Sequence, residues 1–196
     1  MPQQADGPSR LERDSMGELQ VPAGAFYGAN SQRAKLNFPI SDLKFNRSFI
    51  KALGQSKQSA SRVNRDLDAL DPVLGAAIDS AAQKVIDGEY DDQFVVDIFQ
   101  TGSGTSTNMN TNEVISNVAI SSLGGELGSR DPVHPNDHVN KGQSSNDVIP
   151  TAIHLAAAGA IKDGLLPAMA ELEDALRAKS EDFWPIIKTG RTHLQD

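Results

Sequence analysis

The sequence contains no cysteine, which excludes disulfide bonds, thiolate zinc sites and a cysteine nucleophile. Aromatic residues make up only 5% of the 196 residues, and there is a single tryptophan. No apolar run is long enough to span a bilayer, because the longest uncharged stretch, residues 148–161, includes Pro150 and His154. The first ten residues also lack the apolar segment of a signal peptide, so we expect a cytoplasmic protein.

The charge balance argues against a nucleic-acid partner. Acidic residues outnumber basic ones by 26 to 18, and the net charge of −8 repels phosphate backbones. A content of 38% hydrophobic and 22% charged residues is that of an ordinary globular protein. The length allows one domain, or one domain and part of another.

Apolar residues recur at helical spacing in four segments before residue 124, namely 45–67, 72–86, 94–99 and 114–123. Asp71-Pro72 and Gly88 supply the start and stop signals of the second helix. We expect irregular chain over residues 11–40, with a short strand around residues 19–21. The segment 124–147 has no sustained period and is expected to be a loop.

The longest predicted helix begins after Asn146-Asp147, with Pro150 in its first turn, and can run to about Trp184. Pro167 predicts a kink just before it. Its apolar stripe consists of Leu165, Met169, Leu172, Leu176 and Phe183. Nothing else in the sequence matches this length, so we expect a member of a helical bundle that the chain does not complete by itself.

A Gly-Ser-Gly-Thr sequence precedes the helix predicted over residues 114–123. Gly102 and Gly104 let the backbone approach a ligand closely, and Ser103 and Thr105 add hydroxyl donors. The N-terminus of the following helix adds free N–H groups and a positive dipole end, so the segment suits a small anion. No lysine follows as in a Walker loop, and a flexible loop with capping hydroxyls is the alternative on spacing alone.

Two histidines, His134 and His138, stand four residues apart in the sequence His-Pro-Asn-Asp-His. This spacing aligns two metal ligands only on a helix, and Pro135 interrupts that geometry. With no third histidine nearby, we expect no metal site. A polar turn that presents imidazole and amide groups to a small anion is favoured instead.

Two further polar segments are candidates for chemistry. Ser144, Ser145 and Asn146 precede the long helix, where they either cap its N-terminus or donate hydrogen bonds to a ligand. Near the end of the sequence, His193 follows Thr192 and has the pKa range of a general acid or base near neutral pH. A Ser–His–Asp hydrolase is disfavoured, because there is no Gly-x-Ser-x-Gly elbow and no βα alternation.

Together, the polar segments resemble the class II fumarases of the fumarase/aspartase superfamily, over about Leu11 to Asp196. The matching segments are Met16-Gly17-Glu18, Val21-Pro22, Tyr27-Gly28, GSGTSTNMNTNEV, HPNDHVN, QSSND and GRTHLQD. Aspartase shares much of this pattern, but its first motif usually reads Ser-Ala-Gly-Thr. This chain has Gly-Ser-Gly-Thr at residues 102–105, which favours fumarase.

The resemblance implies an all-α homotetramer that hydrates fumarate reversibly to (S)-malate in the tricarboxylic acid cycle, with no metal or organic cofactor. Each active site would be built from three chains. The dicarboxylate would be held by Ser103, Gly104, Thr105, Ser144, Ser145 and Asn146. Thr192 and His193 would come from a second chain, with His193 helping to activate water.

The resemblance also implies a secondary dicarboxylate site at His134, Asn136 and Asp137. The family's arginine three residues before that histidine is replaced by Asp131, with Arg130 one place off, which predicts weak binding there.

Residues 1–10 are polar and contain two prolines, so we expect a disordered tail there. The resemblance implies that residues 11–147 are the N-terminal lyase domain and that 148–196 are the start of a central bundle of long helices. Family members continue into a loop with the catalytic serine and a Lys-x-Asn segment, so we expect a truncated chain that is inactive alone. The alternatives are an aspartate ammonia-lyase, or a fragment that acts only as a binding or assembly module.

Overall fold

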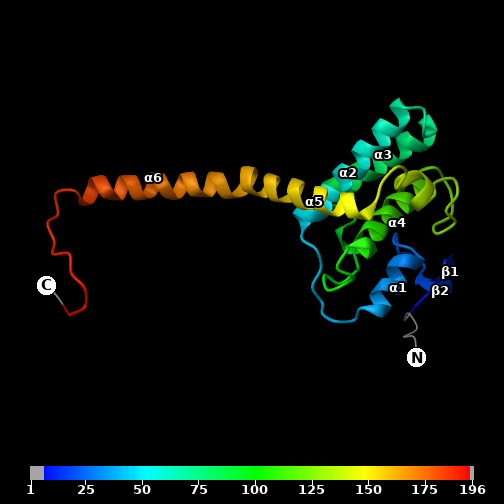
Figure 1. Ribbon diagram of the computed structural model, residues 1–196, viewed down its shortest axis with the longest axis horizontal. Coiled ribbons are helices and arrows are strands. Elements are labelled where there is room, and N and C mark those ends of the chain that lie inside the picture. Colours follow the sequence, from blue (N-terminus) through cyan, green and yellow to red (C-terminus); the bar gives the residue numbers. More distant parts are fainter. Residues whose placement is uncertain (1–6, 195–196) are drawn as a thin grey trace. The chain divides into compact units, whose positions relative to one another are not determined.

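The computed structural model describes residues 7–194, and its contacts divide the chain into two units, Met1–Ala156 and Ala157–Asp196. The regular secondary structure of the described part is helical apart from one two-stranded hairpin, which confirms the predicted all-α class (Figure 1). The elements are β1 (Ser9–Asp14), β2 (Gly17–Pro22), α1 (Ala29–Asn37), α2 (Arg47–Asp66), α3 (Pro72–Asp87), η1 (Asp91–Gln93), α4 (Thr105–Ser122), η2 (Pro135–Val139), α5 (Ser145–Ala160), η3 (Ile161–Leu165) and α6 (Leu166–Phe183). Within residues 7–194, no helix is long and apolar enough to cross a membrane.

Strands β1 and β2 form an antiparallel hairpin that the sequence predicts only in part. The expected disordered tail over residues 1–10 is wrong at Ser9 and Arg10, which belong to β1, whereas residues 1–6 lie outside the described part. Arg10 accounts for this order, because its guanidinium donates hydrogen bonds of 2.7 to 3.1 Å to backbone carbonyls. The carbonyls belong to Pro22, Ala23, Ala25 and Tyr27.

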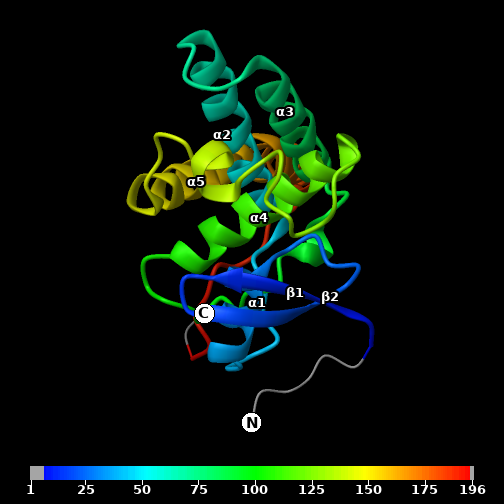
Figure 2. The same ribbon diagram turned by 90° about the vertical axis from the view of Figure 1, so that its right-hand side faces the viewer.

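Helices α2 and α3 lie side by side in both views (Figures 1 and 2), and their predicted boundaries are confirmed to within two residues. Asp71 caps α3 by accepting hydrogen bonds from the backbone N–H groups of Val73 and Leu74. Gly88 ends the helix with a left-handed φ of 90°. These caps are interactions between near neighbours, which is why the sequence reveals them.

Residues 94–99, which we expected to form a short helix, are irregular. The buried Asp97 accounts for the irregular conformation, because its carboxylate accepts hydrogen bonds from Ser41 N, Ser41 Oγ and Phe99 N at 2.6 to 2.9 Å. Nearby, Val95 N donates to Asn110 Oδ1 on α4 at 3.1 Å. Side-chain acceptors therefore take the place of a helical hydrogen-bond ladder, and apolar spacing does not report such acceptors.

Helix α4 is the centre of the first unit, and every residue from Asn110 to Ile120 is buried. Its apolar residues share a core with α3, and that core includes Val85, Val114, Val118 and Val133. A helix that is buried on all sides must also find partners for its polar side chains. These partners determine how the rest of the unit is attached.

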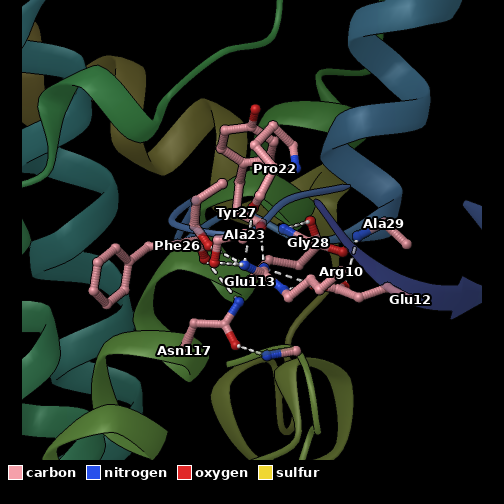
Figure 3. Close-up of polar contacts among 12 residues, drawn as sticks. Arg10, Glu12, Pro22, Ala23, Phe26, Tyr27, Gly28, Ala29, Glu113 and Asn117 are labelled. Carbon is pink, nitrogen blue, oxygen red and sulfur yellow. Dashed lines mark hydrogen bonds and ion pairs between the residues drawn. The ribbon is translucent and has the colours of Figure 1, made fainter. Parts of the chain in front are cut away.

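Glu113 attaches α1 to α4 (Figure 3). Its buried carboxylate accepts five hydrogen bonds of 2.5 to 3.0 Å from backbone and side-chain groups of Gly28, Asn30 and Ser31, at the N-terminus of α1. A carboxylate there also interacts favourably with the helix dipole. Helix α1 lies in a segment expected to be irregular, and this distant capping group is the reason it forms there.

The predicted long helix begins at Ser145, three residues earlier than expected. Pro150 is therefore the sixth residue of α5 and does not lie in its first turn. The structural division after Ala156 also falls later than the domain boundary that we proposed at residues 147 and 148.

Packing explains where the first unit ends. Val148 and Ala152 of α5 are buried in a cluster with Phe49 and Leu53 of α2. The first two turns of α5 therefore belong to the same core as α2.

The second unit contains the rest of the long helical segment. The π-helical turn η3 ends two residues before Pro167, at the place where the sequence predicts a kink. The apolar stripe that runs from Leu165 at the end of η3 along α6 is exposed. The exposed fractions are 53% for Leu165, 56% for Met169, 60% for Leu172 and 61% for Leu176.

Candidate functional site

The Gly-Ser-Gly-Thr segment forms the turn that begins α4. Gly104 is the N-cap residue and has a left-handed backbone, with φ of 69° and ψ of 12°. Gly104 has no side chain to cap the helix, and Gln100 Oε1 accepts a hydrogen bond from Thr107 N at 2.9 Å. The N–H groups of Thr105 and Ser106 precede it in the first turn, where N–H groups have no partners within their own helix. The hydroxyls of Ser103 and Thr105 lie 2.9 Å apart, and both residues are exposed. The turn therefore presents backbone and hydroxyl donors to solvent.

The Gln-Ser-Ser-Asn segment forms the start of α5. Ser144 Oγ accepts a hydrogen bond from Asn146 N at 3.3 Å, so this hydroxyl takes part in capping. The carbonyl of Ser144 accepts from the N–H groups of Asp147 and Val148. Ser144 and Asn146 are exposed and Ser145 is half-buried, so amide and hydroxyl groups surround a second helix N-terminus.

The structure brings these two helix starts together. Asn108, in the first turn of α4, donates from Nδ2 to Ser145 Oγ at 3.1 Å. A Cβ added to Gly104 would lie 3.0 Å from the side chain of Ile149 on α5. Two segments that are 40 residues apart in the sequence therefore form one polar surface with the positive ends of two helix dipoles.

The His-Pro-Asn-Asp-His segment forms the π-helical turn η2, capped by His134. Nδ1 of His134 accepts hydrogen bonds from Asn136 N at 3.3 Å and Asp137 N at 3.1 Å. The neutral ring then carries its proton on Nε2, so the 3.2 Å approach of the Asp137 carboxylate to Nδ1 is not an ion pair. Asn136 and Asp137 are exposed beside His134, which makes this a polar surface turn.

His138, the second histidine of this segment, faces the backbone. Its Nδ1 accepts a hydrogen bond from His134 N at 2.9 Å. Burial lowers the pKa of His138 below its ordinary value. Among residues 7–194, no three His, Cys, Asp or Glu side chains are grouped as metal ligands.

Arg130 does not take the place of the arginine that Asp131 replaces. It has a left-handed backbone with φ of 60°, and its guanidinium donates to the backbone carbonyl of Arg13 on β1. Asp131 itself is exposed. The guanidinium of Arg130, the arginine next to the His134 turn, is thus hydrogen-bonded to the hairpin.

Thr192 and His193 belong to the second unit, where both are exposed. Gln195 and Asp196, which end the same sequence segment, lie outside the described residues. The role of His193 stays a prediction.

Sequence reasoning missed the buried polar residues behind the two helix starts. Lys57 on α2 is fully buried and donates from Nζ to Asn140 Oδ1 at 2.9 Å and to Gln143 Oε1 at 3.0 Å. Asn108 joins this group through a 3.2 Å hydrogen bond from Nδ2 to the same oxygen of Asn140. The sequence contains one indication that Lys57 is buried, because Lys57 lies four residues after Leu53 and therefore on the apolar face of its helix.

Comparison with known proteins agrees with the motifs. A protein-family profile described as "Lyase" matches residues 17–196. The chain is 57% identical over 187 residues to fumarate hydratase class II of Halobacterium salinarum, covering 95% of this chain and 40% of that protein. It is 54% identical over 189 residues to the mitochondrial fumarate hydratase of Homo sapiens, covering 95% of this chain and 37% of that protein.

Solved structures agree as well. The crystal structure of a fumarate lyase:delta crystallin protein from Brucella melitensis has a TM-score of 0.93 and 43% identity, over 96% of this chain and 44% of that one. The class II fumarase from Schistosoma mansoni has a TM-score of 0.92 and 40% identity, over 96% of this chain and 40% of that one.

The chain spans about two fifths of the length of these curated relatives. Within that span, the family profile, the sequence identities and the fold all agree. The chain therefore belongs to the lyase family of the fumarase/aspartase superfamily, to which the class II fumarate hydratases belong.

Proposed function

We propose that the protein containing this chain hydrates fumarate reversibly to (S)-malate. The observation that carries the proposal is the meeting of two helix N-termini, those of α4 and α5, through the hydrogen bond from Asn108 to Ser145. Fumarate and malate are small dianions, and a surface with two positive helix ends and exposed hydroxyls suits them. Relatives that share 57% and 54% of the matched residues are named fumarate hydratases, which supports the same activity.

The residues at the two helix starts match the chemistry of hydration. Removing a proton beside a carboxylate leaves extra negative charge on that carboxylate. Preorganised N–H and hydroxyl donors stabilise such charge without being reorganised during the reaction. The donors are provided by Ser103, Gly104, Thr105, Ser144, Ser145 and Asn146. Because they are dipoles and not cations, they hold the dianion without fully neutralising it.

We further propose that the active protein is a homotetramer in which Thr192 and His193 reach the site of a neighbouring chain. The exposed stripe of Leu165, Met169 and Leu172 in the second unit supports association, because burying such side chains is favourable. There, His193 would accept a proton from the water whose oxygen bonds to one alkene carbon, while the other alkene carbon gains a proton. The predicted cytoplasmic location stays a prediction, since relatives include mitochondrial proteins.

The His134 turn is a weaker proposal. Asn136 and Asp137 are exposed and the ring of His134 has its Nε2 proton available, so the turn offers donors to a second dicarboxylate. The guanidinium of Arg130 is engaged with Arg13 in the hairpin, so we propose that any binding at this turn is weak.

The test is a direct assay of this chain and of any longer product of its gene. Hydration is followed by the loss of the ultraviolet absorbance of fumarate, and ammonia release from aspartate is measured in parallel. In whichever product is active, we expect hydration without ammonia release. Ammonia release from aspartate faster than dehydration of malate would overturn the assignment in favour of aspartase.

A second assay tests His193 in the active product. His193→Asn should lower kcat by about 10²- to 10⁴-fold while sedimentation still shows a tetramer. Tetramers mixed from His193→Asn and Thr105→Val chains should regain activity, because some shared sites then contain both native residues. An unchanged kcat, or loss of the tetramer, would assign His193 to structure.

A further inference from the structure

Lys57 is the least expected residue in the core of the first unit. Its exposed fraction is 0%, and it is among the largest fully buried side chains. Lysine is almost never fully buried unless it is paired, because the ammonium group loses its hydration. Burial lowers the pKa of Lys57 to about 7. In the part of the chain that the structure describes, no carboxylate lies within ion-pair distance of Nζ.

The two acceptors of Lys57 Nζ stand at the base of one loop. Asn140 accepts through Oδ1 and Gln143 through Oε1, so both amide nitrogens face the other way. Asn140 Nδ2 donates to the backbone carbonyl of Gln143 at 3.1 Å, and Gln143 Nε2 donates to that of Val139 at 3.0 Å. Each amide thus joins the ammonium group to the loop backbone, and the ammonium determines which way each amide points.

The same group of residues reaches the proposed site. Asn108 Nδ2 donates both to Asn140 Oδ1 and to Ser145 Oγ, at 3.2 and 3.1 Å. Because Ser145 Oγ accepts this hydrogen bond, its own O–H group is left to donate elsewhere. A hydroxyl that must donate to a substrate carboxylate is oriented correctly by such an arrangement.

We propose that Lys57 is a positioning residue, which fixes the loop over residues 140–144 and, through Asn140 and Asn108, directs the hydroxyl of Ser145 at the start of α5 toward the dicarboxylate. The part that concerns the substrate rests on the proposed function. The part that concerns the loop does not, and it can be measured separately.

The first test replaces Lys57 by methionine, which keeps the length of the side chain and removes the donors. In the product that shows hydration, Lys57→Met should raise KM for malate about 10- to 100-fold, because a charged hydrogen-bonding group is lost behind the binding surface. We expect kcat to change less than about threefold, since Lys57 does not touch the reacting atoms. Lys51→Met is the matched control, because Lys51 is exposed on the same helix.

The second test measures hydrogen exchange in and next to the loop, and it does not depend on enzymatic activity. The N–H groups of Gln143 and Val148 donate to the carbonyls of Asn140 and Ser144. Their hydrogen exchange should become at least about tenfold faster in Lys57→Met, while exchange across α3 stays unchanged. Unchanged exchange at both amides, or an unchanged KM, overturns the proposal. Absence of hydration by every wild-type product overturns only the proposed function, and the exchange measurement still decides the role of Lys57.

Chemical rescue separates the ammonium group from side-chain volume. The chain has no cysteine, so Lys57→Cys introduces a single thiol. Alkylating it with 2-bromoethylamine in denaturant and refolding the chain restores an ammonium at nearly the native length. The alkylated chain should regain slow exchange at Gln143 and Val148, and the unalkylated chain should not. Should Lys57→Met fail to fold, this pair makes the same comparison, and equal exchange in both chains overturns the proposal.

Discussion

Gly104 is the residue on which the geometry of the candidate site depends most directly. Its φ of 69° lies in the left-handed region, which costs a residue with a Cβ about 1–2 kcal/mol. An added Cβ would also lie 3.0 Å from Cδ1 and Cγ1 of Ile149, a contact that forces a shift in packing and costs about 1–3 kcal/mol. The unfolded chain loses freedom with alanine, which offsets about 0.4–1 kcal/mol. We therefore expect Gly104→Ala to lower the free energy of unfolding by about 1–4 kcal/mol.

The chain contains a matched control two residues away. Gly102 lies in the same turn, its φ is outside the left-handed region, and a Cβ added to it would have no other atom within 4 Å. Gly102→Ala should therefore change the free energy of unfolding by no more than about 0.5 kcal/mol. Unfolding in urea is best followed by circular dichroism, because Trp184 is 86% exposed and its fluorescence does not report on the core.

A double substitution separates the two costs. Ile149→Ala removes the three side-chain atoms that would lie nearest to the new methyl group. Combining it with Gly104→Ala should recover the packing part of the loss and leave the left-handed strain of about 1–2 kcal/mol. If Gly104→Ala costs no more than Gly102→Ala, then α4 does not begin with a left-handed residue against α5. The convergence of the two helix starts, and the site built on it, would then be refuted.

Two further predictions concern buried charged groups. Glu113→Gln puts an amide NH2 among the donors of Gly28, Asn30 and Ser31, and should lower the free energy of unfolding by about 2–4 kcal/mol. Glu126→Gln, at an exposed position, should stay within about 0.5 kcal/mol of wild type, and an equal loss in both variants would contradict the capping role of Glu113. For Lys57, whose folded pKa is lowered to about 7 from a usual value of 10.5, the unfolded state binds more protons between these pH values. The free energy of unfolding of wild type, relative to that of Lys57→Met, should therefore rise with pH from about 7 toward 10.5. Urea titrations at several pH values in this range measure it, and a difference that does not change with pH would contradict the burial of the Lys57 ammonium group.

The sequence by itself was sufficient wherever the deciding interaction is local. Asp71 caps α3 within three residues, and Gly88 ends it through its own backbone, so both boundaries were predictable. The apolar stripe of α2 predicted a helix for the same reason, because side chains three and four residues apart share a face. The polar motifs were recognisable in the same way, since each lies within a few consecutive residues.

Tertiary structure decided the features whose partners lie far away along the chain. Helix α1 depends on Glu113, more than 80 residues later, and the irregular segment at Asp97 depends on Ser41. Neither apolar spacing nor local capping contains this information. The side chains of Glu113 and Asp97 are buried, so each must be paired, but the sequence does not say with which group.

The candidate site follows the same rule. The sequence predicts a helix after each polar motif, although α4 begins at Thr105, nine residues before the helix predicted over residues 114–123. The meeting of the two helix starts depends on α5 packing against α2 and on the hydrogen bond from Asn108 to Ser145. Lys57 behind them has its acceptors 83 and 86 residues away. A hydrogen bond within one turn is visible in the order of residues, whereas one between distant segments exists only once the core has brought them together.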